Sequence, residues 1–177
     1  MEKPKQQGRS LTLLRAVGEG VTAVAAGDPH AFDVAARRLW RMSAPSTPRV
    51  LEMTARLMLE ELVDDAALAA TAWPALARCR DRARRWLPQV DEELLAVLLF
   101  VGALGGEDTG WLPEPAATRH RLLLIAEIAT TGDLRVAAFL DAALAAHDRA
   151  GHALPAAMTP AWLPRTRLPS DPTPTGR

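Results

Sequence analysis

The chain has 177 residues, of which 49% are apolar, and its 21 acidic side chains balance 21 lysines and arginines. This length suits a single globular domain with its own hydrophobic core, and the zero net charge provides no overall field that would attract nucleic acid or an anionic membrane. Tyrosine and asparagine are absent, and Cys79 is the single cysteine, so an intrachain disulfide is excluded.

The N-terminal decapeptide is polar and is not followed by the apolar core and cleavage site of a secretory signal. The longest uncharged apolar run, residues 94–106, is shorter than the roughly 18 to 20 residues that cross a bilayer. We therefore expect a cytoplasmic protein with no membrane contact. The abundance of Ala, Arg, Pro and Gly, with lysine only at Lys3 and Lys5, is typical of a GC-rich bacterial genome.

Apolar residues recur every three or four positions from Leu11 onward, which is the period of helices that bury one face. The first two helices are expected over residues 11–26 and 29–42. Between them Gly27 can end the first helix, while Asp28 can cap the second and be followed by a proline in its first turn.

The third and fourth helices are expected over residues 48–63 and 66–87. Pro74 lies within the fourth and should bend or divide it, because proline lacks the N–H that the helical ladder needs. Pro88 should end this helix.

A fifth helix is expected over residues 92–104, with Asp91 as its cap. Residues 94–101 are apolar on every side, a pattern that favours a helix surrounded by others. The segment 94–104 is therefore predicted to be the most buried helix of the molecule. The Gly- and Pro-rich residues 105–115 that follow it should form a loop.

The last two helices are expected over residues 116–130 and 134–149, separated by Gly132 and Asp133. After Gly151 prolines recur, and they preclude regular structure.

These patterns predict an all-α fold, a single compact irregular bundle of six to seven helices over residues 10–153. A disordered segment over 1–9 would precede it, and a Pro-rich flexible tail over 154–177 would follow. The alternative is a short α-hairpin repeat or solenoid, because the Gly-Asp joints at 27–28 and 132–133 each separate two Ala-rich amphipathic segments. This arrangement resembles tetratricopeptide-like repeats, but the spacing of the two joints is not a clean multiple of that period and the aromatic positions are missing.

The segment 78–86 carries five arginines and is the sharpest local feature of the chain. On a helix, Arg78, Arg82 and Arg85 would form one stripe, and guanidinium groups bind carboxylates and phosphates bidentately. This stripe is a candidate partner-binding surface; the alternative is a solvated face whose charges pair with nearby acids. Trp111, in the Gly- and Pro-rich loop, is a second candidate partner contact, or else a lid on the core.

The sequence contains no recognisable catalytic, cofactor-binding or metal-binding set. The four histidines lack the spacing of a metal site, and no serine stands in a nucleophile elbow. Cys79 lies on an apolar helix face and is expected to be a small buried hydrophobe. Residues 102–110 are glycine-rich but lack the Lys-Ser/Thr ending of a phosphate loop. A cleft lined by Cys79, or by a histidine beside an acid, would instead indicate an enzyme.

We therefore expect a non-enzymatic, cytoplasmic helical interaction or regulatory protein that binds a protein partner or itself. An alternative is a nucleic-acid-associated regulator that uses the arginine-rich helix, although asparagine is absent and the chain is neutral. A second alternative is a small enzyme or a ligand-binding bundle with a pocket between its helices.

Overall fold

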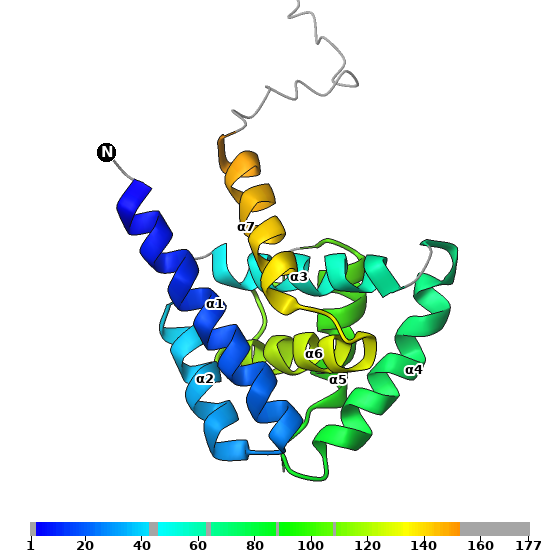
Figure 1. Ribbon diagram of the computed structural model, residues 1–177. Helices are drawn as coiled ribbons and strands as arrows, with labels where there is room; N and C mark the ends of the chain where they lie inside the picture. Colours follow the sequence, from blue (N-terminus) through cyan, green and yellow to red (C-terminus); the bar gives the residue numbers. More distant parts are fainter. Residues whose placement is uncertain (1–2, 43–45, 63–64, 88, 108, 153–177) are drawn as a thin grey trace, which may run out of the picture.

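The computed structural model describes residues 3–42, 46–62, 65–87, 89–107 and 109–152. These residues form seven α-helices and one π-helix and contain no strand, which confirms the predicted all-α class and number of helices (Figure 1). In chain order the helices are α1 (Lys3–Ala26), α2 (Pro29–Arg41), α3 (Ser46–Leu62), α4 (Asp65–Ala83), α5 (Glu92–Val97), the π-helix η1 (Leu98–Leu104), α6 (Ala116–Gly132) and α7 (Val136–His152).

The joint between α1 and α2 forms as its sequence predicts. Gly27 has a φ of 65°, a left-handed conformation that glycine adopts without strain. The Asp28 carboxylate accepts hydrogen bonds from the backbone N–H groups of His30 and Ala31, at 2.9 and 3.0 Å. Asp28 thus satisfies two donors that the first turn of α2 would otherwise leave unpaired.

Helix α1 begins earlier than the sequence pattern indicated. Residues 3–9, expected to be disordered, belong to the helix. Pro4 lies in its first turn, where a missing N–H breaks no helical hydrogen bond, and the following lysine and glutamines have favourable helix propensities. The absence of an apolar period there therefore did not exclude a helix.

Helix α4 runs through Pro74 without being divided. Packing on both sides of the proline supports this helix: the Trp73 ring lies against Phe100 of η1 with ring centroids 4.7 Å apart and planes tilted by 41°, and Leu76 is buried. Tertiary contacts of this kind can offset the hydrogen bond that proline removes. The helix ends at Ala83, before the expected end at residue 87, so Arg85 lies in the turn that follows.

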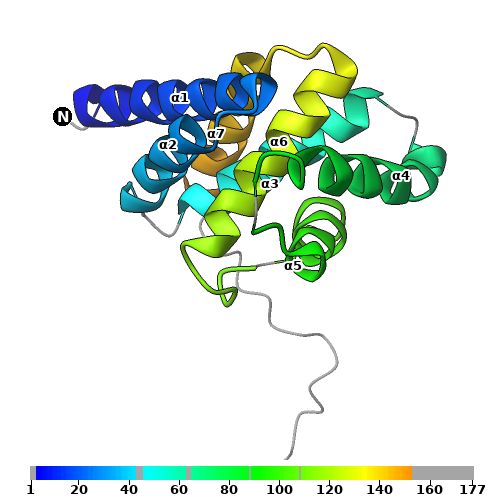
Figure 2. The same cartoon turned by 90° about the horizontal axis from the view of Figure 1, so that it is seen from below.

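The centre of the bundle is α6 rather than the segment 94–104. Every residue of α6 from 117 to 129 except Arg119 is buried, and α1, α2, α3, α4, α5 and η1 all pack against this helix (Figure 2). In the segment 94–104, Val97, Phe100 and Leu104 are only half-buried. The prediction for that segment is wrong because only one side of it faces the bundle.

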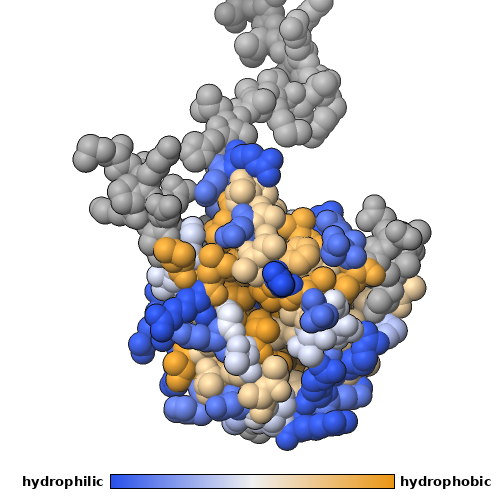
Figure 3. Space-filling view, in the orientation of Figure 1, coloured by the Kyte–Doolittle hydropathy of each residue, from blue (hydrophilic) through white to orange (hydrophobic). Residues whose placement is uncertain are grey.

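The helices pack as a compact bundle and not as a stack of repeated hairpins. Helices α1 and α2 do form a packed pair, but α7 packs on α3 and α1 rather than along α6. In the view of Figure 3, apolar residues follow α7 across the middle of the face and hydrophilic residues surround them. Among the described helices, none has both the length and the hydropathy of a membrane span. The predicted tail over 154–177 lies outside the described residues.

Candidate functional site

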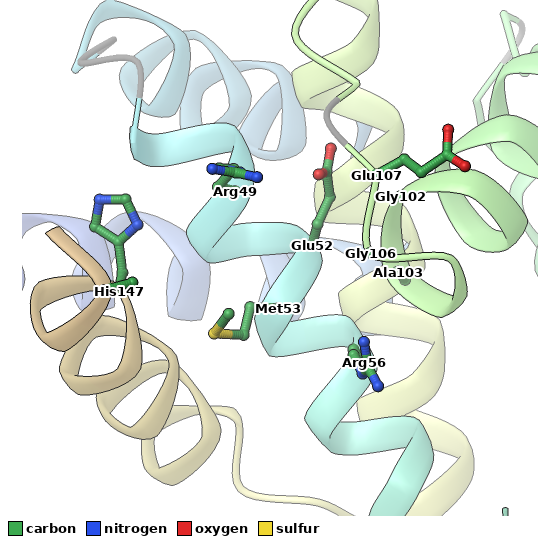
Figure 4. Close-up of a pocket in the computed structure, with 10 residues that line it drawn as sticks. Arg49, Glu52, Met53, Arg56, Gly102, Ala103, Gly106, Glu107 and His147 are labelled. Carbon is green, nitrogen blue, oxygen red and sulfur yellow. The ribbon is translucent and has the colours of Figure 1, made fainter. Parts of the chain in front are cut away.

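A polar cleft lies between α3, the C-terminal end of α7 and the end of η1 with the residues that follow it (Figure 4). Its volume is about 250 Å³. The polar cleft is lined by Arg49, Glu52, Met53, Arg56, Gly102, Ala103, Gly106, Glu107, His147 and Ala150.

Helix α3 supplies the long wall of the polar cleft. Arg49, Glu52, Met53 and Arg56 are spaced by three and four residues, which places them on one face of a helix. The Met53 side chain points toward α7, whose His147 lies on the opposite wall (Figure 4). Arg56 pairs with Glu60 at 2.7 Å, whereas Arg49 is exposed and forms no ion pair with any described residue.

Behind this wall lies a buried charged network centred on Arg121, whose side chain is 2% exposed. Its Nε donates to Glu52 Oε1 at 2.7 Å, its Nη1 to Glu114 Oε1 at 2.6 Å and its Nη2 to Thr109 Oγ1 at 2.8 Å. The Thr109 hydroxyl donates in turn to Glu52, and the Thr118 N–H donates to Glu114 Oε2 at 3.0 Å. Each buried charge therefore meets an opposite charge and further hydrogen bonds, as burial in a low-dielectric interior requires.

Gly102 allows η1 to lie against this network. A Cβ at this position would stand 3.1 Å from Cγ2 of Thr109 and 3.2 Å from Cδ of Glu52. Because Gly102 has no side chain, the backbone of η1 itself forms this part of the wall of the polar cleft. Because π-helices are rare and often mark functional sites, the position of η1 beside this network singles out the polar cleft as the candidate site.

Sequence reasoning did not find this network, because Glu52 and Arg121 are 69 positions apart in the chain. One signal was present: Glu127 interrupts the apolar run 122–129 of α6, and Arg121 stands at the start of that run. Charged residues within such a run indicate buried partners supplied by other helices.

His120, one of the groups that could take part in catalysis, has a structural role. His120 is buried; its Nε2 accepts from the Asp91 N–H at 2.9 Å, and its Nδ1 bonds the Ala116 carbonyl at 2.8 Å. Burial lowers the pKa of His120, which favours the neutral ring. His147 forms no hydrogen bond with an acid among the described residues.

A second hollow, the apolar pocket, lies between α3, α4, η1 and α6 and has a volume of about 210 Å³. Cys79 lies on its wall, and burial raises the pKa of the Cys79 thiol to about 12, which keeps the sulfur protonated and slow to react. The apolar pocket is lined by Leu59, Leu62, Ala75, Leu76, Arg78, Cys79, Leu99, Leu124, Glu127, Ile128 and Thr131.

The three arginines of the predicted partner surface differ in their surroundings. Arg78 lines the apolar pocket, Arg82 pairs with the buried Glu127 at 3.1 Å, and Arg85 lies beyond the end of α4. Trp111 is 70% exposed, so it does not fold back as a lid on the core. Whether any of these side chains binds a partner stays a prediction.

The other two arginines of the segment 78–86 are engaged with acids. Arg80 bonds both Asp81 and Glu92 at 2.7 Å, and these hydrogen bonds raise the pKa of Arg80 and, at Asp81, lower that of the carboxyl. Arg84 lies 3.7 Å from the second oxygen of Glu92. These contacts leave few free guanidinium groups on this side of α4.

The described residues thus form an all-α bundle whose hollows include the polar cleft and the apolar pocket. Within the described residues, no three histidine, cysteine or acidic side chains gather where they could hold a metal ion. The chain matches no protein-family model, no curated protein and no solved structure.

Proposed function

We propose that this chain is a non-enzymatic helical binding protein that holds a segment of a protein partner in the polar cleft. The observation that carries the proposal is the makeup of one wall: the exposed guanidinium groups of Arg49 and Arg56 stand on either side of the half-buried thioether of Met53. Guanidinium groups suit carboxylates, and methionine adapts to varied apolar side chains.

The network behind this wall favours binding over reaction. Glu52 accepts hydrogen bonds from Arg121 and Thr109, so its carboxylate is held in place as an acceptor. A catalytic base must be able to come within hydrogen-bond reach of a substrate proton. A paired, immobile carboxylate instead gives the wall a fixed shape, which lowers the entropy lost when a partner binds.

The wall also suggests the chemistry of the partner. Arg49 and Arg56 are two turns apart on α3, or about 10 Å along its axis. A segment in which an apolar side chain stands between two carboxylates would place its acids on the arginines and its apolar group on Met53. The exposed Arg56–Glu60 pair would not prevent this, because such pairs contribute at most about 1 kcal/mol.

Affinity capture with the immobilised full chain tests the proposal. The double variant Arg49→Ala with Arg56→Ala should lose the partner that the parent chain retains. The triple variant Arg78→Ala, Arg82→Ala and Arg85→Ala, directed at the sequence-predicted stripe, should keep it. Arg41→Ala, at an exposed arginine on α2, serves as the matched control. Retention by the double variant and loss by the triple one would move the site to the stripe and refute the polar cleft.

The same experiment separates a protein partner from nucleic acid. Binding to phosphates falls steeply as salt rises, because each neutralised phosphate releases a counterion. Capture in the polar cleft should survive nuclease treatment and weaken only modestly between low and moderate salt. Capture that requires nucleic acid would support the regulator that uses the arginine-rich helix, and would count against the present proposal.

A further inference from the structure

The apolar pocket is large enough to hold a small ligand. Its volume of about 210 Å³ exceeds the roughly 150 Å³ of an engineered apolar cavity that binds benzene. Buried leucines form its walls, Leu76 from α4, Leu99 from η1 and Leu124 from α6. The pocket therefore has room for a phenyl group or a short alkyl chain.

Of the two charged side chains that line the apolar pocket, one has an ion-pair partner and the other has none among the described residues. Glu127, with a side chain 5% exposed, pairs with Arg82 at 3.1 Å and accepts a long contact of 3.4 Å from the Thr131 hydroxyl. Arg78, one turn before Arg82, is exposed and forms no ion pair with any described residue. Among the described lining residues, the charged group that lacks an ion-pair partner is thus the exposed Arg78 guanidinium.

We propose that the apolar pocket binds small monocarboxylates with an apolar body of about six to eight carbons. The carboxylate would bond the Arg78 guanidinium, and the body would lie among Leu76, Leu99 and Leu124. This site is separate from the polar cleft, and it does not depend on the function proposed for that cleft.

The alternatives to a carboxylate are disfavoured by the same contacts. A cationic ligand would have to displace Arg82, whose side chain is 44% exposed, from its existing pair with Glu127. A neutral ligand would bury the same apolar surface but forgo the charge-assisted hydrogen bond to Arg78. The proposal therefore predicts a ranking by charge among ligands of equal length.

Titration calorimetry of the full chain with octanoate, 1-octanol and octylammonium tests this ranking. Octanoate should bind saturably and at least about tenfold more tightly than octanol, the effect of about 1.4 kcal/mol, and octylammonium should bind most weakly. Arg78→Gln should remove the preference for octanoate while leaving octanol binding unchanged. Arg85→Gln changes an arginine of the same run that does not line the pocket, and it should bind like the parent chain.

The single cysteine gives a second readout that does not depend on heats. Cys79 lines the pocket, so a methanethiosulfonate reagent that enters it should label the thiol slowly, and octanoate should slow the labelling further in a dose-dependent way. Ala75→Leu, which fills part of the pocket from a half-buried position, should abolish this protection, with helix content checked by circular dichroism.

Three results would overturn the proposal. The first is equal affinity for octanol and octanoate. The second is an equal loss of octanoate binding in Arg85→Gln and Arg78→Gln. The third is the absence of both heat and Cys79 protection at millimolar octanoate, since the parent chain would then have no functional pocket for this class of ligand.

Discussion

The guanidinium of Arg121 is the buried charge on which most of the charged network depends. We predict that Arg121→Met, which removes the cation but keeps much of the volume, lowers the free energy of unfolding by about 3–5 kcal/mol, because Glu52 and Glu114 lose their buried partner. Urea unfolding at neutral pH measures this loss. Arg15→Ala, at an exposed pair with Glu19, should change stability by less than about 1 kcal/mol. Equal effects of the two variants would mean that the network is not a closed buried unit.

His120 should make stability depend on pH in one direction. Its folded-state pKa lies below the usual value near 6.5, first because of burial, so the unfolded chain binds the proton more readily. Its contribution to stability is complete above about pH 6.5 and is lost as the pH falls from there toward the folded pKa. In addition, Nε2 of the neutral ring accepts the hydrogen bond from the Asp91 N–H. Protonation of Nε2 would remove this acceptor and place two N–H donors face to face.

Urea midpoints between pH 7 and 5 measure this dependence. His120→Gln should flatten the pH slope, whereas His30→Gln, at an exposed histidine near the start of α2, should keep it. A slope that is unchanged in His120→Gln would assign the pH dependence to other groups.

Features that depend on neighbouring residues, such as helix caps, were predictable from the sequence. Contacts between residues far apart in the chain were not. Asp28 and Asp91 were recognisable as helix caps because a cap needs only its own next turn, and both side chains accept the expected backbone N–H bonds. Arg49 and Glu52 visibly share a helix face. Nothing local indicates that this face meets the end of α7 and, through Glu52, the guanidinium of Arg121.

At the scale of helices, the close packing of η1 against Thr109 and Glu52 at Gly102 leads to a prediction. Gly102→Ala should destabilise the fold by about 1–3 kcal/mol, because the added methyl group overpacks the contact with Thr109 and Glu52. Gly18→Ala is the matched control: a Cβ there meets nothing within 4 Å, and alanine should stabilise α1 by about 0.5–1 kcal/mol. Thermal unfolding of both variants compares them. Stabilisation by Gly102→Ala would show that η1 does not press on the network.

The apolar pattern of the sequence predicts that the segment 94–104 is the most buried helix, whereas the structure places α6 at the centre of the bundle. A helix that is apolar on every side is expected to be buried on every side. Charged residues such as Arg121 and Glu127 are, by the same rule, expected to face solvent. In the structure both charges are buried because other helices supply Glu52 and Arg82. The positions of helices follow from short-range signals, whereas their depth in the molecule depends on partners that are remote in sequence.

For the whole molecule, the central position of α6 implies that the helices unfold together. Ile125 is fully buried in α6, and Ile125→Ala should lower the free energy of unfolding by about 2–5 kcal/mol. Far-ultraviolet circular dichroism and tryptophan fluorescence should shift together and keep coincident midpoints. Separate midpoints would show that the part of the bundle remote from Ile125 unfolds independently.

Helix α7 differs from the other helices in that it packs mainly on α3 and, to a smaller extent, on α1, with little contact with the central helix α6 (Figure 1). Its amide protons should therefore exchange with solvent deuterium sooner than those of α6, because a helix attached on one side can open without unfolding the rest. Since His147 and Ala150 belong to the polar cleft, each such opening removes a wall of that cleft. Anything bound across α3 and α7 must then slow deuterium uptake in α7 selectively, which makes the exchange rate of this one helix a direct measure of occupancy.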